Sequence, residues 1–409
     1  MKEKTKTNKG ITLIALILTI IVLLILAVVT ISAVTGNGII AHAKNARDLY
    51  GAKSEEENAL LQNYLEQLNK ETKGNGGSSD GNKKIDGITV KGSLNAIIST
   101  TANTPLTDDF GNKITVPAGF KIITKTDTEN TDLNYTADDI NVTKGIVVED
   151  GEGNQFVWIP VGTIYTNTEK TESKTITLGR YVFKSDGTID TALSQITPEG
   201  QLKTNPYYYY TEGKKNETTE NAHAKDIEAF VSKANASGGY YLGRYEARTG
   251  TERKAKTDEL TKVTSKTNDY VYNWITQAQA SERCQSMYTN KPYESDLVNS
   301  YAWDTAIVFI QEFENGTYSQ TKAEASDSKL SNKGLSILKA TSAVDMQCNI
   351  YDMAGNCFEW STETYSSSEH PCNTRGGFYG NSDIYTSLRS NSIMTNASGV
   401  ASFRPVLYM

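Results

Sequence analysis

The chain is poor in the residues that several common functions need. It has only three histidines in 409 residues, and they stand far apart, so a histidine-rich metal site is not expected. It also lacks an excess of positive charge. The formal net charge is −7, which argues against nucleic acid as a partner because phosphate binding needs a basic face. No phosphate-binding loop and no Ser/His/Asp set can be recognised.

Cysteine is scarce as well. The four cysteines all lie in the last third of the chain, and no two of them form a C-x-x-C pair. In an exported domain four cysteines can form one or two disulfides, with three full pairings to choose from. Buried free thiols are the alternative, and the sequence leaves both open. The cysteines are Cys284, Cys348, Cys357 and Cys372.

Charge is absent from one long run near the N-terminus. Residues 11–34, ITLIALILTIIVLLILAVVTISAV, span roughly 36 Å as a helix, enough for a bilayer core of about 30 Å. Four lysines in residues 1–10 place this leader on the cytoplasmic side. We therefore predict a single-pass membrane protein with an extracellular C-terminal domain. A plain signal anchor fits this pattern, whereas the apolar region of a cleaved signal peptide is shorter, about 7–15 residues.

The junction between the leader and the hydrophobic run is more specific. Its sequence K-G-I-T-L-I, Lys9–Ile14, resembles the prepilin cleavage and methylation motif of type IV pilins and pseudopilins. The resemblance implies that prepilin peptidase cuts after Gly10, that Ile11 is methylated, and that other pilin subunits are partners. The chain departs from this family at the fifth mature position, where Ala15 replaces the usual glutamate. Losing that buried charge suits a minor or tip subunit rather than a bulk one.

The segment after the hydrophobic run predicts a spine and a tether. Apolar residues keep recurring at three- and four-residue steps, so we expect a long helix over residues 11–70. No clean heptad accompanies it. Residues 71–86 are rich in glycine, serine and charge, which predicts a flexible linker. The extracellular body is then expected to cover residues 87–409.

The body has the composition of a β-rich domain. Between residues 87 and 162, short β-branched runs alternate with Gly, Asp and Asn clusters, which predicts strands and turns. Residues 165–225 are rich in Thr, Lys and Glu and are interpreted as an insertion or an exposed sheet. Helices are expected near residues 226–236, 274–288 and 301–314.

Three sequence blocks follow one another near the C-terminus. They are NIYDMAGNCFEWSTETY (residues 349–365), TRGGFYG (374–380) and SFRPVLYM (402–409). Their order resembles the formylglycine-generating-enzyme-like domain of the sulfatase-modifying factor family, in which D-M-x-G-N-x-x-E-W precedes R-G-G and G-F-R. Upstream, FVWIPVG, GGYYLGRYEA and WITQAQASERCQSM fit the same plan, so the resemblance covers about residues 115–409. It implies an α+β fold, an irregular, β-rich variant of the C-type lectin fold with long loops.

The first block has two interpretations. In the simpler one, Gly355 makes a tight turn and Trp360 anchors the core. In the other, implied by the family resemblance, the block binds calcium, which takes oxygen ligands from carboxylates and backbone carbonyls. Carried over by position, the ligands would be the side chains of Asp352 and Glu359 and the carbonyls of Gly355 and Cys357.

The segment between the second and third blocks bears on catalysis. Catalytic members of the resembled family carry a cysteine pair there, whose thiolates bind copper and activate oxygen. Here residues 378–402 contain no cysteine, and Ser402 replaces the usual glycine of the third block. Without the nucleophile the chain is not expected to be an enzyme. The rival hypothesis is a membrane-tethered oxidase of the formylglycine-generating type.

The same segment is rich in side chains suited to adaptable polar and aromatic contacts. The predicted ligand-binding residues are Tyr379, Asn381, Ser382, Asp383, Tyr385, Ser390, Asn391 and Ser392. Diversity-generating retroelements target this part of related C-type-lectin-fold proteins, so the resemblance also implies diversification here; a polar loop is the alternative. We therefore predict a surface-exposed minor or tip pilin-like protein that presents a protein- or glycan-binding domain. A structural surface protein without its own ligand is the alternative.

Overall fold

The computed structural model describes part of the chain. All described residues lie within one unit, Gly81–Met409, so the predicted leader, hydrophobic helix and most of the linker lie outside them. None of the described helices combines the length and the apolar character needed to cross a membrane. The described ranges are 83–85, 88–90, 99–126, 130–190, 226–267, 269–322, 345–364, 372–381, 383–393 and 396–409.

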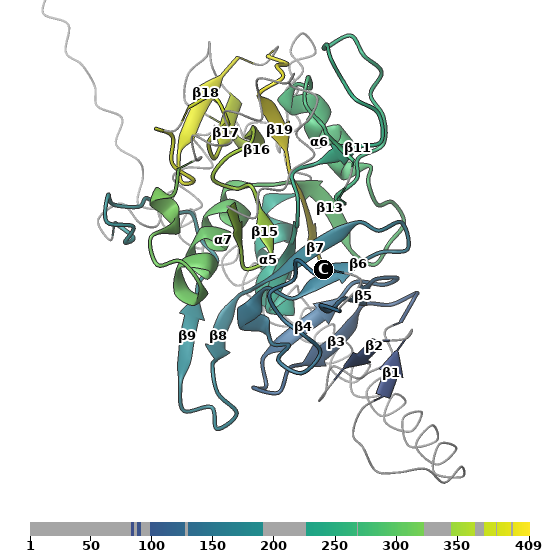
Figure 1. The fold of residues 1–409 in the computed structure, drawn as a ribbon, viewed down its shortest axis with the longest axis vertical. Helices are drawn as coiled ribbons and strands as arrows, with labels where there is room; N and C mark the ends of the chain where they lie inside the picture. Colours follow the sequence, from purple (N-terminus) through teal and green to yellow (C-terminus); the bar gives the residue numbers. More distant parts are fainter. Residues whose placement is uncertain are drawn as a thin grey trace, which may run out of the picture. The chain divides into compact units, whose positions relative to one another are not determined.

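A six-stranded antiparallel sheet forms the centre of the fold (Figure 1). In spatial order its strands are β13 (Glu294–Leu297), β20 (Pro405–Tyr408), β10 (Gly239–Gly243), β7 (Gln155–Pro160), β6 (Val147–Glu149) and β5 (Lys121–Ile122). Strands β7, β10 and β20 are buried at every position. Because a strand buried on both faces needs apolar side chains on both, these segments have nearly continuous apolar sequences.

The described residues form three α-helices, α5 (Ile227–Ser237), α6 (Gln277–Gln285) and α7 (Ser300–Phe313). Each begins after a capping side chain, Asp226, Thr276 or Asn299, whose oxygen accepts a backbone N–H of the first turn. Helix α7 is buried from its first residue to Ile310 and contacts both β7 and β16. These helices confirm the three that the sequence predicted, to within a few residues at each end.

A second, four-stranded sheet carries the C-terminal sequence blocks (yellow in Figure 1). In spatial order its strands are β18 (Arg389–Ser392), β17 (Cys372–Arg375), β16 (Phe358–Thr364) and β19 (Ala401–Phe403). Strands β16 and β19 run parallel, and the other pairs are antiparallel. Strands β17 and β19 are buried, whereas β18 is partly exposed along its length.

Short elements complete the described structure. The two-stranded antiparallel sheets are β1–β2 (Lys83–Ile85, Ile88–Val90), β3–β4 (Thr104–Thr107, Lys113–Val116), β8–β9 (Gly162–Tyr165, Ser173–Ile176), β11–β12 (Arg248–Thr249, Tyr270–Val271) and β14–β15 (Met346–Gln347, Ile350–Tyr351). The 3-10 helices are η2 (Val142–Lys144) and η3 (Tyr318–Gln320). Strand β9, within the segment interpreted as an insertion or an exposed sheet, is exposed at three of its four positions.

The described part of the chain is therefore β-rich with few helices, which confirms the coarse fold class. Large aromatic side chains fill its interior. Trp158, Trp303 and Trp360 are completely buried, and the Trp158 ring lies 5.0 Å from the Tyr241 ring between centroids. Such rings bury a large apolar area per residue, so they contribute strongly to the stability of a domain with few regular elements.

Candidate functional site

The three C-terminal sequence blocks come together in the four-stranded sheet. Strand β16 of the first block pairs with β17 on one side and with β19 on the other. Arg404 of the third block binds Glu359 of the first through two contacts, Nη2 to Oε1 at 2.5 Å and Nε to Oε2 at 3.0 Å. Both side chains are completely buried. Arg404 also donates to the carbonyl oxygens of Gly243 and Tyr351, which explains how so buried a guanidinium is satisfied.

Two glycines of the second block allow a close approach of backbones. Gly376 has φ +70°, and a Cβ on it would lie 2.5 Å from the carbonyl oxygen of Met353. A Cβ on Gly377 would lie 2.5 Å from the carbonyl oxygen of Ala354. Real Cβ atoms do not come so close to a carbonyl oxygen, so the second block fits against the first only with glycine at these positions.

Five charged side chains, four of them buried and the fifth, Arg389, 21% exposed, adjoin this region, and we call them the guanidinium cluster. The cluster consists of Arg180, Arg375, Arg389, Asp304 and Glu363. The Glu363 carboxylate accepts from all three arginines at 2.6 to 3.1 Å, and Asp304 accepts from Arg375 and Arg389. Burial alone raises the pKa of Glu363, but Arg389, Arg180 and Arg375 outweigh it and hold that pKa well below its usual range. Glu363 is therefore a carboxylate at neutral pH.

The guanidinium cluster holds both ends of one loop. Arg375 ends β17 and Arg389 begins β18, and the two residues pair directly across the sheet. Between them, the Trp303 indole donates to the carbonyl oxygen of Thr386 at 3.0 Å. The Ser387 hydroxyl donates to the carbonyl oxygen of Ser319 at 2.7 Å. Directional hydrogen bonds and ion pairs therefore hold the loop from β17 to β18 in place.

The predicted ligand-binding residues separate into exposed and buried groups. Four of them, Asn381, Asp383, Tyr385 and Asn391, are exposed. Ser390 and Ser392 lie on the edge strand β18 and are partly exposed, and Ser382 lies outside the described residues. Tyr379 is placed differently from the rest. Its side chain is buried in a small cluster with Val271 and Cys357, so its ring is not presented at the surface.

Exposed apolar side chains are concentrated in this same segment. Among the described residues, the exposed large hydrophobic side chains are Tyr385, 38% exposed, and Ile393, 44% exposed. Lys322 lies beside the first of them, with Nζ 4.8 Å from the ring centroid and 3.5 Å from Oδ1 of Asp383. We use the name candidate face for the exposed residues of this segment, Asn381, Asp383, Tyr385, Asn391 and Ile393, together with Lys322, which lies beside Tyr385 and Asp383.

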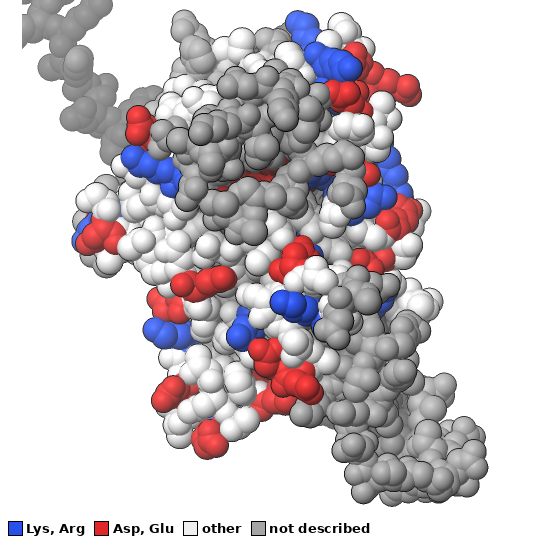
Figure 2. Space-filling view, in the orientation of Figure 1, with Lys and Arg blue, Asp and Glu red and all other residues white. Residues whose placement is uncertain are grey.

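Two members of the candidate face were not predicted from the sequence. The sequence could have pointed to Ile393, because it is an apolar residue directly after the polar strand β18. No sequence pattern pointed to Lys322, since it belongs to another part of the chain and reaches the face through an isolated bridge to Tyr385. On the side of the molecule shown in Figure 2, basic and acidic side chains of the described residues are interspersed.

One of the residues predicted to bind calcium, Glu359, already has a protein partner at both of its ligating oxygens. Both carboxylate oxygens of Glu359 accept from Arg404, so ligation by Glu359 would require this ion pair to open. The left-handed residues of the block are Asn349, Asp352 and Asn356, with φ of 63°, 61° and 59°, and Gly355 is not one of them. No group of three or more His, Cys, Asp and Glu side chains suited to a metal ion occurs in the described ranges. Calcium binding remains a prediction.

Trp360 bears out the simpler interpretation of the same block. Its side chain is completely buried, and its indole Nε1 donates to the carbonyl oxygen of Ile275 at 2.9 Å. Buried indoles usually find such a partner. The residue is therefore the core anchor that the sequence predicted.

All four cysteines are buried free thiols, the second of the two alternatives that the sequence left open. Burial raises the pKa of each thiol, and it raises the pKa of Cys372 to about 12. Because the thiolate is the nucleophile and metal ligand, cysteines in this state are unreactive at neutral pH.

Comparisons with known proteins find remote likenesses only. No family model and no curated protein sequence matches the chain. PvdO from Pseudomonas aeruginosa matches 42% of this chain and 82% of its own, with 11% identity and a TM-score of 0.29. Treponema denticola variable protein 1 matches 42% and 85%, with 15% identity and a TM-score of 0.26. CarF matches 34% and 67%, with 14% identity and a TM-score of 0.24. TM-scores at this level do not assign a family.

Proposed function

We propose that this chain is a surface-exposed minor or tip type IV pilin-like protein. Its C-terminal domain, of the C-type-lectin-like and formylglycine-generating-enzyme-like type, binds a protein or glycan through the candidate face. One observation carries the binding role: the exposed large apolar side chains of the described residues, Tyr385 and Ile393, both lie in the segment between the second and third blocks. An exposed aromatic ring among polar side chains is typical of a binding surface.

The candidate face has the chemistry of a protein or glycan recognition surface. Tyr385 offers a large, rigid ring with a hydroxyl, and tyrosine is enriched at binding hot spots. The exposed amides of Asn381 and Asn391 can both donate and accept hydrogen bonds. The guanidinium cluster holds the base of the loop, so little ordering is needed on binding.

The role is proposed to be non-catalytic. The four thiols are buried, and the pKa of each is raised, so the chain offers no thiolate of the kind that the resembled enzymes use. The segment from residue 378 to residue 402 also contains no cysteine. A binding role needs neither a reactive thiolate nor a cysteine in this segment.

The membrane part of the proposal rests on residues 1–34. Prepilin peptidase is expected to cut after Gly10, which makes Ile11 the first residue of the mature chain. Mass spectrometry of the native protein should then find an N-methylated Ile11. An intact leader would leave only a generic membrane anchor, with no role for pilin subunits as partners. A reverse transcriptase gene with a template repeat matching the codons of residues 379–392 would identify a retroelement target.

The binding role can be tested with full-length chain on arrays of glycans and proteins. Tyr385→Ala and Ile393→Ser should each weaken binding to any ligand found by about tenfold or more, as hot-spot residues do. Tyr165→Ala is the matched control, because Tyr165 is a partly exposed tyrosine of β8 with a lysine, Lys170, 5.4 Å from its ring centroid. Equal losses in all three variants, or no ligand at all, would favour a structural surface protein.

A further inference from the structure

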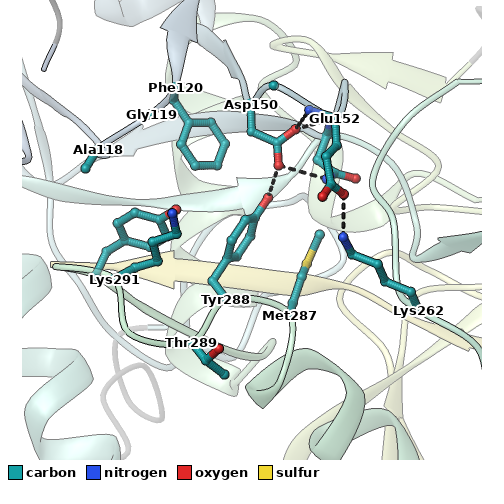
Figure 3. Close-up of a pocket in the computed structure, with 13 residues that line it drawn as sticks. Ala118, Gly119, Phe120, Asp150, Glu152, Lys262, Met287, Tyr288, Thr289 and Lys291 are labelled. Carbon is teal, nitrogen blue, oxygen red and sulfur yellow. Dashed lines mark hydrogen bonds and ion pairs between the residues drawn. The ribbon is translucent and has the colours of Figure 1, made fainter. Parts of the chain in front are cut away.

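A pocket of about 310 Å³ opens on another part of the domain (Figure 3). Its lining comes from the turn between β4 and β5, the turn between β6 and β7, the loop between α6 and β13, and Lys262 in the loop between β11 and β12. None of its lining residues belongs to the candidate face. Its volume is at the lower end of the range for small-molecule sites, about 300 to 1,000 Å³, which suits a ligand of one ring.

Aromatic rings form one side of this pocket. Phe120, Tyr288 and Tyr293 contact one another, with ring centroids 5.5 to 5.8 Å apart. Phe120 and Tyr293 are buried, whereas Tyr288 is partly exposed. In Figure 3 the Phe120 ring lies beside Asp150 and the Tyr288 ring lies below it. The pocket therefore has a firm aromatic wall against which the carbon face of a ligand can pack.

The negative charges of the pocket already have partners. The Asp150 carboxylate accepts four hydrogen bonds, from the backbone N–H groups of Glu152 and Asn154, the Asn154 amide and the Tyr288 hydroxyl, the last at 2.6 Å. The carboxylate of Glu152 pairs with Lys262 at 2.5 Å. A cationic ligand would have to compete with the four donors of Asp150 or with Lys262, so the pocket offers it no carboxylate without a partner.

Two donors of the pocket have no such partner. Lys291 is exposed, and none of the residues that the structure describes forms an ion pair or hydrogen bond with its ammonium group. The Tyr293 hydroxyl likewise has no hydrogen-bond partner among them. Burial, together with the nearby Asp150, raises the pKa of Tyr293, so its hydroxyl keeps the proton and remains a donor. The pocket thus offers one positive charge and one hydroxyl next to an aromatic wall.

We propose that this pocket binds a single hexuronic acid unit of a glycan. The carbon face of the sugar ring packs against the Tyr288 ring, and its carboxylate binds the Lys291 ammonium group. The Tyr293 hydroxyl donates to a ring hydroxyl, and the Glu152–Lys262 pair at the rim offers both an acceptor and donors to the others. A neutral hexose has the same ring and hydroxyls but leaves Lys291 without a partner, so it binds more weakly.

The experiment compares glucuronate with glucose by saturation-transfer NMR titration on the purified full-length chain. Glucuronate should bind about tenfold more tightly, which corresponds to one charge-assisted hydrogen bond. Lys291→Gln should remove this preference and leave glucose binding unchanged. Lys174→Gln, which removes an exposed lysine of β9 outside the pocket, is the matched control and should change neither. Tyr293→Phe should weaken both sugars and keep the preference.

Sugar binding in the pocket can be tested independently of ligand binding at the candidate face. Tyr385→Ala, which alters the candidate face, should leave glucuronate binding unchanged because its side chain does not line the pocket. Absence of saturable binding of either sugar would overturn the inference. So would a glucuronate preference that survives Lys291→Gln, since the carboxylate would then be bound elsewhere.

Discussion

The six-stranded and four-stranded sheets of this domain are stabilised in different ways. Strands β7, β10 and β20 of the first are buried at every position and are mainly apolar. The second sheet has a buried strand, β17, beside the partly exposed edge strand β18, and buried ion pairs adjoin it. The six-stranded sheet therefore stabilises the fold by apolar burial. The four-stranded sheet exposes side chains on its edge strand and is held in place by buried ion pairs.

The charged contacts beside the second sheet differ from apolar contacts in being directional. Apolar contact is not directional, so it lets neighbouring segments shift by small amounts. A guanidinium between two carboxylates is bound along several fixed directions, as Arg375 is between Asp304 and Glu363. We infer that the guanidinium cluster fixes the loop from β17 to β18, even though buried ion pairs often add little net stability.

The largest expected effect comes from breaking this cluster. Glu363→Gln removes the carboxylate that three arginines share and leaves buried positive charge without compensation. We expect the free energy of unfolding to fall by about 3–5 kcal/mol, measured by urea denaturation. The control in the first sheet is Ile159→Val, which trims a buried side chain of β7 and should cost about 0.5–1.5 kcal/mol.

The two variants should differ more in ligand affinity than in stability. Per folded molecule, Glu363→Gln should weaken binding at the candidate face, because the loop loses its base. Ile159→Val should leave that binding unchanged, since β7 lies in the other sheet. If both variants bind as the unaltered chain does, the guanidinium cluster stabilises the fold only, and the comparison between the sheets fails.

The next effect is a pH dependence with opposite signs at two buried carboxyls. The pKa of Glu363 is lowered in the folded state, so its contribution to stability is present above its unfolded pKa, about 4.3, and is lost as the pH falls through the folded pKa. Glu246 is completely buried, and its carboxylate accepts from the Asn356 amide and the Cys357 backbone N–H. Burial, together with Asp352 and Glu359, raises the pKa of Glu246. Its contribution is present below the unfolded pKa and is lost as the pH rises through the folded one.

Urea unfolding between about pH 3 and about pH 8 tests these signs. Each unit of pKa shift corresponds to about 1.4 kcal/mol, so both effects should be measurable. Glu363→Gln should flatten the acid side of the profile, and Glu246→Gln should flatten its neutral side. Identical profiles for the two variants would show that the two buried networks do not titrate separately.

Calcium is expected to have the smallest effect. If it binds at Asp352 and Glu359, it must compete with Arg404, so we expect a melting temperature only a few degrees higher with calcium than with chelator. Magnesium serves as the control, because it demands a stricter geometry and retains its waters. Equal melting temperatures with calcium and with chelator would show that the domain does not bind calcium at this site.

Local patterns explain why much of the fold was predictable. Asp226, Thr276 and Asn299 each precede a helical pattern in the sequence, and each caps a helix in the structure. The candidate segment was chosen because it lies between two recognisable blocks and is polar and aromatic, and its role in binding stays a prediction. Its exact membership was not predictable: Tyr379 is buried, and Lys322 joins the face from a distant part of the chain. Neither fact follows from sequence position.

The sequence by itself determined the helices, the buried strands, the order of the three blocks and the absence of a cysteine between the last two. These follow from periodicity, capping and composition, which act over a few residues. Only the tertiary structure decided that Arg180 joins Arg375 and Arg389 around one carboxylate, and that Arg404 occupies Glu359. The reason is that a buried charge takes its partner from whatever segment folding brings near, at any distance along the chain.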